Sequence, residues 1–79
     1  MNIKILGAGC ARCNKLAKLA QKAVAQLEIN ADVVKVSDLD KIMSYGVVMT
    51  PALVINEQVM IAGRIPSIEQ LIAWIKESS

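Results

Sequence analysis

A long amphipathic helical pattern between two short apolar segments most constrains what this chain can fold into. From Ala11 to about Leu27, apolar side chains recur every three or four residues, and mostly polar side chains take the other face. Residues 2–6 before this pattern and Ala31–Val36 after it have the apolar character of strands. Two strands joined by a long helix run parallel, with a right-handed crossover. The chain is therefore predicted to contain a β-α-β unit and to belong to the α/β class.

A short helix is predicted after the second strand. Ser37 to Asp40 supplies acidic residues where the amino end of a helix favours them. In this helix we expect Leu39, Ile42 and Met43 to face inward. Gly46 is expected to end it, because glycine tolerates the backbone conformation that follows a helix.

A hairpin and a final helix complete the predicted order. Ala52–Ile55 and Val59–Ile61 have the composition of strands, and Asn56-Glu57-Gln58 is short enough to join them as an antiparallel pair. The final helix is predicted to start at Ser67, whose hydroxyl forms a capping box with Gln70. Its inner side chains are expected to be Ile68, Leu71, Ile72 and Ile75.

These segments predict the order β-α-β-α-β-β-α, with a four-stranded mixed sheet flanked by three helices. No repeat, linker or low-complexity stretch interrupts the order. We therefore expect residues 1–79 to form a single domain. Such a small domain needs an efficient core, and 54% of the residues are apolar.

Charge and hydropathy exclude several classes of function. The formal net charge is +2, with no run of like charges, so the electrostatic footprint of a nucleic-acid-binding protein is missing. No apolar stretch approaches the length that spans a bilayer, and the first residues lack the features of a secretory signal. We expect a cytoplasmic protein that acts neither on nucleic acid nor in the membrane. In that compartment thiols are kept reduced.

The two cysteines, Cys10 and Cys13, are the residues that can carry chemistry. Cys10 falls where the first strand gives way to the long helix, so the free N–H groups of the first turn are expected to favour its thiolate. Thiols in such positions have pKa values of about 3.5 to 7.5, against about 8.5 for an ordinary cysteine. Cys13 lies one helical turn on, close enough to attack a mixed disulfide on Cys10. Arg12 and Lys15 are cations in the same region, or simply solvated side chains.

Other uses of the same cysteine pair lead to different classes of protein. A structural disulfide is disfavoured, because so short a loop removes little chain entropy and the expected compartment is reducing. A soft-metal site is the serious rival, since two thiolates suffice for Cu(I). A closed zinc site needs further ligands, and the chain contains no histidine. The lack of histidine also argues against a cysteine hydrolase, which uses a Cys-His pair.

Three features together resemble the thioredoxin-like superfamily, and more narrowly its small redox-active disulfide proteins. They are the segment Gly7-Ala8-Gly9-Cys10-Ala11-Arg12-Cys13, the Thr50-Pro51 step, and an ending of hairpin, Gly63 and helix. The resemblance covers almost the whole chain. It implies that Pro51 is cis and faces the cysteine pair. It also implies that the backbone of Thr50 pairs with an extended segment of the partner protein.

The chain departs from the patterns of the better-known relatives. Thioredoxins usually carry Trp-Cys-Gly-Pro-Cys, whereas here Gly9 precedes Cys10 and Ala11-Arg12 separates the cysteines. They also place a buried acid six residues before the first cysteine, where this chain has Lys4. The glutathione-binding segment of glutaredoxins is reduced to Ala62-Gly63-Arg64. Glutathione binding is therefore not expected, and proton transfer needs water or another group.

The sequence predicts a thiol-disulfide oxidoreductase or electron carrier that acts in cell redox homeostasis. Cys10 is expected to attack and Cys13 to resolve, while Thr50, Pro51, Gly9 and Arg12 border the partner protein. The expected partners are a protein disulfide and an upstream dithiol reductase, with no cofactor and a monomeric chain. The alternative is a carrier of Cu(I) or arsenite that uses the same thiolates. A third possibility is a domain of this fold kept mainly for protein interaction.

Overall fold

The elements follow one another in the predicted order in the computed structural model, which describes residues 1–7 and 11–78. They are β1 (Asn2–Leu6), α1 (Ala11–Leu27), β2 (Asp32–Val36), α2 (Leu39–Ser44), β3 (Ala52–Ile55), β4 (Gln58–Ala62) and α3 (Ile68–Ser78). The order β-α-β-α-β-β-α is therefore confirmed, and the predicted ends of the elements agree to within a residue or two. No helix in the described ranges is long and apolar enough to cross a membrane.

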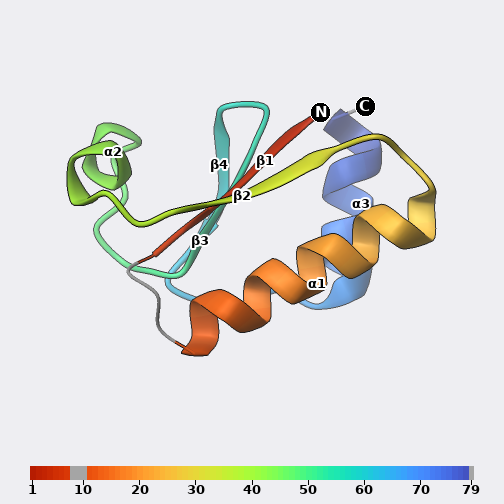
Figure 1. Ribbon diagram of the computed structural model, residues 1–79, viewed down its shortest axis with the longest axis horizontal. Helices are drawn as coiled ribbons and strands as arrows, with labels where there is room; N and C mark the ends of the chain where they lie inside the picture. The colour runs from red at the N-terminus through yellow and green to blue at the C-terminus, as the bar shows by residue number, and fades with distance from the viewer. Residues whose placement is uncertain (8–10, 79) are drawn as a thin grey trace.

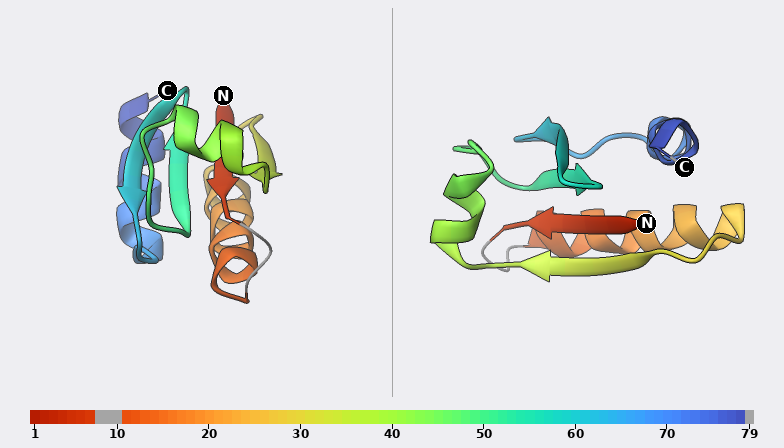
Figure 2. Two further views of the ribbon diagram at one scale, coloured as in Figure 1. Left: turned by 90° about the vertical axis from the view of Figure 1, so that its left-hand side faces the viewer. Right: turned by 90° about the horizontal axis from the view of Figure 1, so that it is seen from above.

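The strands of the described residues form a four-stranded mixed sheet, which is seen obliquely in Figure 1. Their order is β2-β1-β3-β4, as the right-hand view of Figure 2 shows. β1 is parallel to β2, with Ile3 opposite Val33, and antiparallel to β3, with Ile5 opposite Leu53. β3 and β4 form the antiparallel hairpin that the sequence predicts. β1 therefore lies in the interior of the sheet, and its carboxyl end leads directly into the segment that contains the cysteines.

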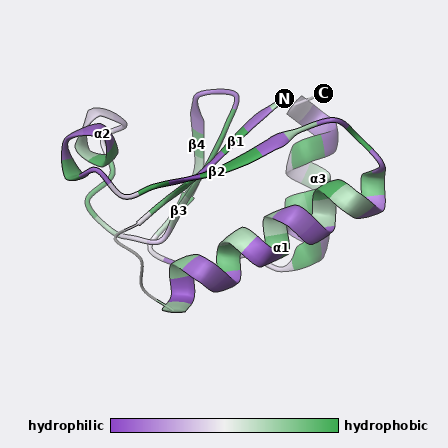
Figure 3. Ribbon diagram, viewed as in Figure 1, coloured by the Kyte–Doolittle hydropathy of each residue, from purple (hydrophilic) through white to green (hydrophobic). Residues whose placement is uncertain are grey.

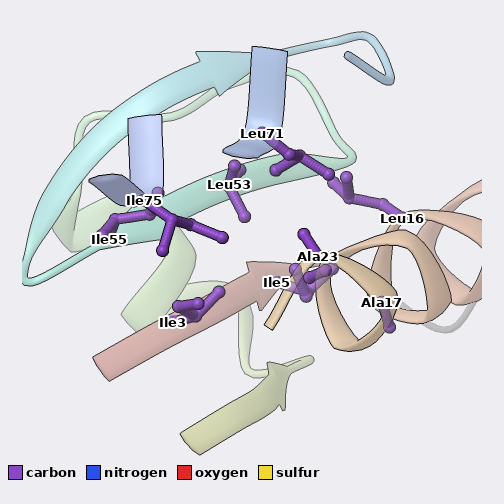
Figure 4. Packing of buried hydrophobic residues seen from close by; sticks show 10 residues of the cluster. Ile3, Ile5, Leu16, Ala17, Ala23, Leu53, Ile55, Leu71 and Ile75 are labelled. Carbon is purple, nitrogen blue, oxygen red and sulfur yellow. The ribbon is translucent and has the colours of Figure 1, made fainter. Parts of the chain in front are cut away.

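Two helices, α1 and α3, cover one face of the sheet, while α2 lies against the other near the carboxyl ends of β1 and β2 (Figure 2). Alternate residues of β1, Ile3 and Ile5, point into the first layer. They join a main core whose buried members come from β1, α1, β3 and α3 (Figure 4). These members are Ile3, Ile5, Leu16, Ala17, Ala20, Ala23, Leu53, Ile55, Leu71 and Ile75. In Figure 3 the ribbon of α1 alternates between the colours of hydrophilic and hydrophobic residues, as its amphipathic pattern predicts.

A smaller apolar cluster lies on the second face, beneath α2. Its buried members are Leu6, Ile42, Val47, Ala52 and Val54. The expectation that Leu39 and Met43 also face inward is wrong, because both are 66% exposed. Ile42 and Tyr45 are the side chains of this region that turn toward the sheet, and Leu39 and Met43 then fall on the flank of a helix with few turns. Gly46 follows the end of α2 with a φ of 77°, as expected.

The hairpin turn is tighter than the sequence indicated. Asn56 and Glu57 alone connect β3 and β4, with φ values of 49° and 70°. Two successive residues with positive φ give the turn whose twist matches that of the paired strands, and asparagine adopts this conformation readily. At the other end of β4, Ser67 Oγ accepts a hydrogen bond from the N–H of Gln70 at 3.2 Å, so the predicted cap of α3 is confirmed.

Candidate functional site

Cys13 lies in the first turn of α1 and is buried against Gly7 at the end of β1. A Cβ added to Gly7 would overlap Cys13 Sγ and lie 3.2 Å from Cys13 Cβ. Only glycine leaves room for the thiol at this position, because any side chain would displace it. The N–H of Gly7 also donates to the carbonyl of Val36 at 2.9 Å, which fixes this end of β1 to β2. The sulfur of Cys13 is therefore held at the carboxyl edge of the sheet.

The Thr50–Pro51 step approaches the same glycine. A Cβ on Gly7 would lie 3.9 Å from Thr50 Cβ, so Thr50 and Cys13 flank a single backbone position. The Thr50–Pro51 peptide bond is cis, which confirms what the resemblance implied. Pro51 is fully buried, whereas Thr50 is exposed. Within the described part of the chain, the backbone of Thr50 makes no hydrogen bond to another residue.

Gly63, just after β4, is hydrogen-bonded to the Thr50–Pro51 step. Its N–H donates to the carbonyl of Pro51 at 2.9 Å. Its φ is 83°, and a Cβ there would lie 3.2 Å from both Cβ and Cε of Met49. Glycine is required for the backbone conformation and for the close approach of Met49. The segment before Pro51 is therefore held against the end of the hairpin.

An apolar groove borders Thr50 on the side of α2. Its volume is about 290 Å³, and it is lined by Leu39, Ile42, Met43, Val47, Val48 and Thr50. Several of the apolar side chains around it are open to solvent, and Val48 is 94% exposed. The sequence analysis missed this groove, since it assigned Leu39 and Met43 to the core.

A lysine that the sequence analysis did not single out lies beside the first turn of α1. Lys35 of β2 donates from Nζ to Oδ1 of Asn14, the residue after Cys13, at 2.7 Å. Arg12 and Lys15, the cations noticed in the sequence, are exposed on α1. No sequence signal marks Lys35, because its contact depends on the parallel register that places β2 next to β1.

The predicted site residues are only partly described. Cys10 and Gly9 lie outside the described residues, so their predicted roles stay predictions. Cys13, Thr50 and Pro51 lie around one end of the sheet, as the sequence analysis expected, while Arg12 is exposed at the start of α1. Among residues 1–7 and 11–78, no group of three or more histidine, cysteine, aspartate or glutamate side chains is placed to hold a metal ion.

Lys4, at the position where thioredoxins carry a buried acid, lies on the opposite face of the sheet from Cys13 and binds an acid itself. Its Nζ donates to Glu57 Oε1 at 2.7 Å and to Tyr45 Oη at 2.8 Å. Tyr45 Oη in turn donates to Glu57 Oε2 at 3.0 Å. The hydrogen bond from Lys4, followed by that from Tyr45, lowers the pKa of Glu57. The hydrogen bond to Glu57, followed by that to Tyr45, raises the pKa of Lys4. We call these three residues the Lys4 cluster.

Comparison with known proteins identifies the family. A family model described as a thioredoxin domain matches residues 1–76. A protein named thioredoxin from Methanothermobacter thermautotrophicus is 38% identical over 71 residues, which cover 90% of this chain and 92% of that protein. Another from Methanocaldococcus jannaschii is 38% identical over 69 residues, covering 87% of this chain and 79% of the relative. The chain therefore belongs to the thioredoxin family.

A solved structure agrees on the fold. Thioredoxin 1 from the thermophilic eubacterium Thermosipho africanus superposes with a TM-score of 0.66 and 21% sequence identity. The match covers 98% of this chain and 92% of that one. The α/β class, the four-stranded mixed sheet and the three helices are thus those of the thioredoxin fold.

Proposed function

We propose that this protein is a thiol-disulfide oxidoreductase that exchanges a Cys10–Cys13 dithiol with the disulfide of a partner protein. One observation carries the proposal: the Cys13 thiol and the exposed residue Thr50 flank Gly7, so the thiol proposed to resolve and the residue proposed to pair with the partner lie together. Membership of the thioredoxin family supports the same chemistry. The partner would pair its backbone with that of Thr50, which makes no hydrogen bond to any other described residue.

The reaction needs two successive exchanges. The Cys10 thiolate attacks one sulfur of the partner disulfide, forms a mixed disulfide and releases the other sulfur as a thiolate. The Cys13 thiolate then attacks Cys10 Sγ, which forms the Cys10–Cys13 disulfide and releases the second partner thiolate. The partner gains two electrons and, from water, two protons. An upstream dithiol returns the pair to its reduced form.

Cysteine variants test the two roles. Cys13→Ser should trap mixed disulfides on Cys10, because the resolving thiol is gone, whereas Cys10→Ser should abolish exchange. Trapped species can be detected by mass spectrometry without reductant. If the two variants kept equal residual activity, the assigned roles would be wrong.

The midpoint potential tests the electrostatics of the pair. The amino end of α1 and the nearby Arg12 favour thiolates and hence the reduced form, so we expect a potential less negative than the −270 mV or so of thioredoxin. The measurement is thiol alkylation, or Trp74 fluorescence, across a dithiothreitol series. A value well below that of thioredoxin would contradict the expectation.

A carrier of Cu(I) or arsenite remains the alternative to test in the same experiment. The described elements follow the order β-α-β-α-β-β-α, whereas copper chaperones have the order β-α-β-β-α-β. This difference supports the redox proposal. Binding of one Cu(I) per pair, with no redox transition in the dithiothreitol series, would favour the metal carrier instead.

A further inference from the structure

Tyr45 stands where α2 ends and the segment that leads to Thr50 begins. Its backbone N–H donates to the carbonyl of Ile42 at 3.2 Å, and the N–H of Gly46 donates to the carbonyl of Met43 at 2.9 Å. The chain then turns out of the helix through the positive φ of Gly46. The course of residues 46–50 therefore starts from wherever Tyr45 is held.

The Lys4 cluster fixes the side chain of Tyr45 to the sheet. Lys4 reaches it from β1, and Glu57 reaches it from the turn between β3 and β4. The Lys4 ammonium also lies 5.6 Å from the centroid of the Tyr45 ring, within range of a cation–π interaction. These contacts join three elements that are distant in sequence. They lie next to the part of α2 that is buried, because Ile42, the buried residue of this helix, is three positions before Tyr45.

The segment after Tyr45 is held again closer to Thr50. Val47 is buried in the smaller cluster beneath α2, and Met49 rests against Gly63. The N–H of Gly63 binds the carbonyl of Pro51. Val48, between these contacts, is open to solvent. The placement of Thr50 thus depends on an anchor at each end of residues 46–50, and the Lys4 cluster is the anchor on the side of α2.

We propose that Lys4, Tyr45 and Glu57 are positioning residues that hold residues 46–50 so that Thr50 presents its backbone to a protein disulfide. This role rests on the proposed function. A protein substrate must pair with Thr50 before its disulfide reaches Cys10, whereas a small disulfide needs only access to the thiolate. Loss of the cluster therefore slows exchange with proteins and leaves exchange with small disulfides unchanged.

Tyr45→Phe tests the role with little change in shape, because it keeps the ring against the apolar cluster and removes the hydroxyl. Loss of a hydrogen-bonded anchor should lower kcat/KM for reduction of insulin about 3-fold to 10-fold. The rate with dithiobis(nitrobenzoic acid), a small disulfide, should stay within about 2-fold of the wild type. Glu69→Gln, which removes an exposed carboxylate on α3, is the matched control for Glu57→Gln and should leave both rates unchanged.

Amide hydrogen exchange reads the positioning without catalysis. The N–H of Gly63 is bonded to Pro51, so its exchange should speed up in Tyr45→Phe, by about 5-fold or more, if the segment loosens. The N–H of Asp32, bonded to Met1 at the other end of the sheet, should be unaffected. Exchanging the charges in the double variant Lys4→Glu/Glu57→Lys should restore part of what Lys4→Glu alone loses.

The outcomes separate this proposal from the function on which it rests. If the wild type reduces both disulfides but Tyr45→Phe matches it in the insulin rate and in Gly63 exchange, the positioning role is overturned and the function stands. If both rates fall in proportion to the unfolded fraction, the cluster is only structural and the proposal fails. A wild type that reduces neither disulfide overturns the proposed function and this proposal together.

Discussion

The two faces of the sheet are built in different ways. The face under α1 and α3 is covered by a continuous apolar core, into which β1 contributes Ile3 and Ile5 (Figure 4). The face under α2 has a small apolar cluster near the carboxyl end of β1, and next to it the polar Lys4 cluster. Beside that cluster, Val34 and Val59 are 47% and 39% exposed. The first face is thus stabilised by buried apolar side chains, and the second is stabilised partly by hydrogen bonds between polar side chains.

Because of this difference, the two sides of the site are expected to differ in rigidity. Cys13, which we propose as the resolving thiol, is buried against Gly7 on the side of α1, so its sulfur has a well-packed support. Thr50 lies at the end of residues 46–50, which continue from α2 on the lightly covered face. A site assembled from both faces can keep its thiol fixed, while residues 46–50, which we propose to position Thr50 for a partner, depend on weaker, exposed contacts.

The largest expected effect is a contrast between two leucines. Leu71→Ala on α3 should lower the free energy of unfolding by about 2–5 kcal/mol, because Leu71 is fully buried in the main core. Leu39→Ala on α2 should change it by less than about 0.5 kcal/mol, since Leu39 is largely exposed. Urea unfolding followed by Trp74 fluorescence measures both. If the two substitutions lowered the free energy of unfolding equally, Leu39 would be buried in solution, and the contrast between the two faces would be wrong.

The next prediction tests the close packing of the Cys13 thiol against Gly7. Gly7→Ala should cost about 1–3 kcal/mol, because the new Cβ overlaps Cys13 Sγ. Adding Cys13→Ala should recover at least half of that cost, since the methyl group then fills the space that the sulfur leaves. Denaturant unfolding of the two single variants and the double variant completes the cycle. If the two costs simply add, the overlap with Cys13 is not their cause.

Removal of the amino-terminal caps of α2 and α3 is expected to have a smaller effect on stability, and it compares the two faces again. Ser67→Ala removes the hydroxyl that binds Gln70 N–H, and Asp38→Ala removes the carboxylate that binds Asp40 N–H. Each should cost about 1 kcal/mol of helix stability. For α3 the cost should appear in global unfolding. For α2 it should appear mainly as faster local amide exchange, and an equal shift in global unfolding would show that both helices belong to one cooperative unit.

The smallest effect is the pH dependence of the Lys4 cluster. The folded-state pKa of Glu57 is lowered below 4.5, so its contribution is present above pH 4.5 and is lost as pH falls through the folded-state value. The folded-state pKa of Lys4 is raised above 10.5, so its contribution is present below pH 10.5 and is lost as pH rises through the folded-state value. Glu57→Gln should therefore melt below the wild type near neutral pH, with the difference disappearing in acid.

Salt is the control for that measurement. Glu57 is exposed, so about 1 M salt should shrink the difference in melting temperature between Glu57→Gln and the wild type. A difference that persisted at low pH or in high salt would mean that the variant acts through shape and not through charge.

Local signals predicted most of the fold and part of the site. The periodicity of α1, the cap at Ser67 and the glycine after α2 each depend on residues a few positions apart, and the structure confirms them. The cis form of Pro51 came from the resemblance and is confirmed as well. Predictions for Cys10 and Gly9 stay predictions, because these residues lie outside those described.

The inward placement of Leu39 and Met43 failed for a definite reason. A helical pattern shows which side chains share a stripe, but a helix of few turns can be rotated so that a neighbouring stripe meets the sheet. Here Ile42 and Tyr45 meet it, and the exposed residues form the groove beside Thr50. Tertiary contacts outweighed the local pattern where the helix was shortest.

The sequence by itself determined the order of the elements, their caps and the spacing of the two cysteines, because those features come from positions along the chain. Only the tertiary structure decided which distant groups meet. Lys4 binds Tyr45 across 41 positions and Glu57 across 53, and Cys13 finds its space at Gly7. Such contacts follow from strand register and from the way helices seat on each face. No local pattern encodes them, since they depend on the whole sheet being assembled.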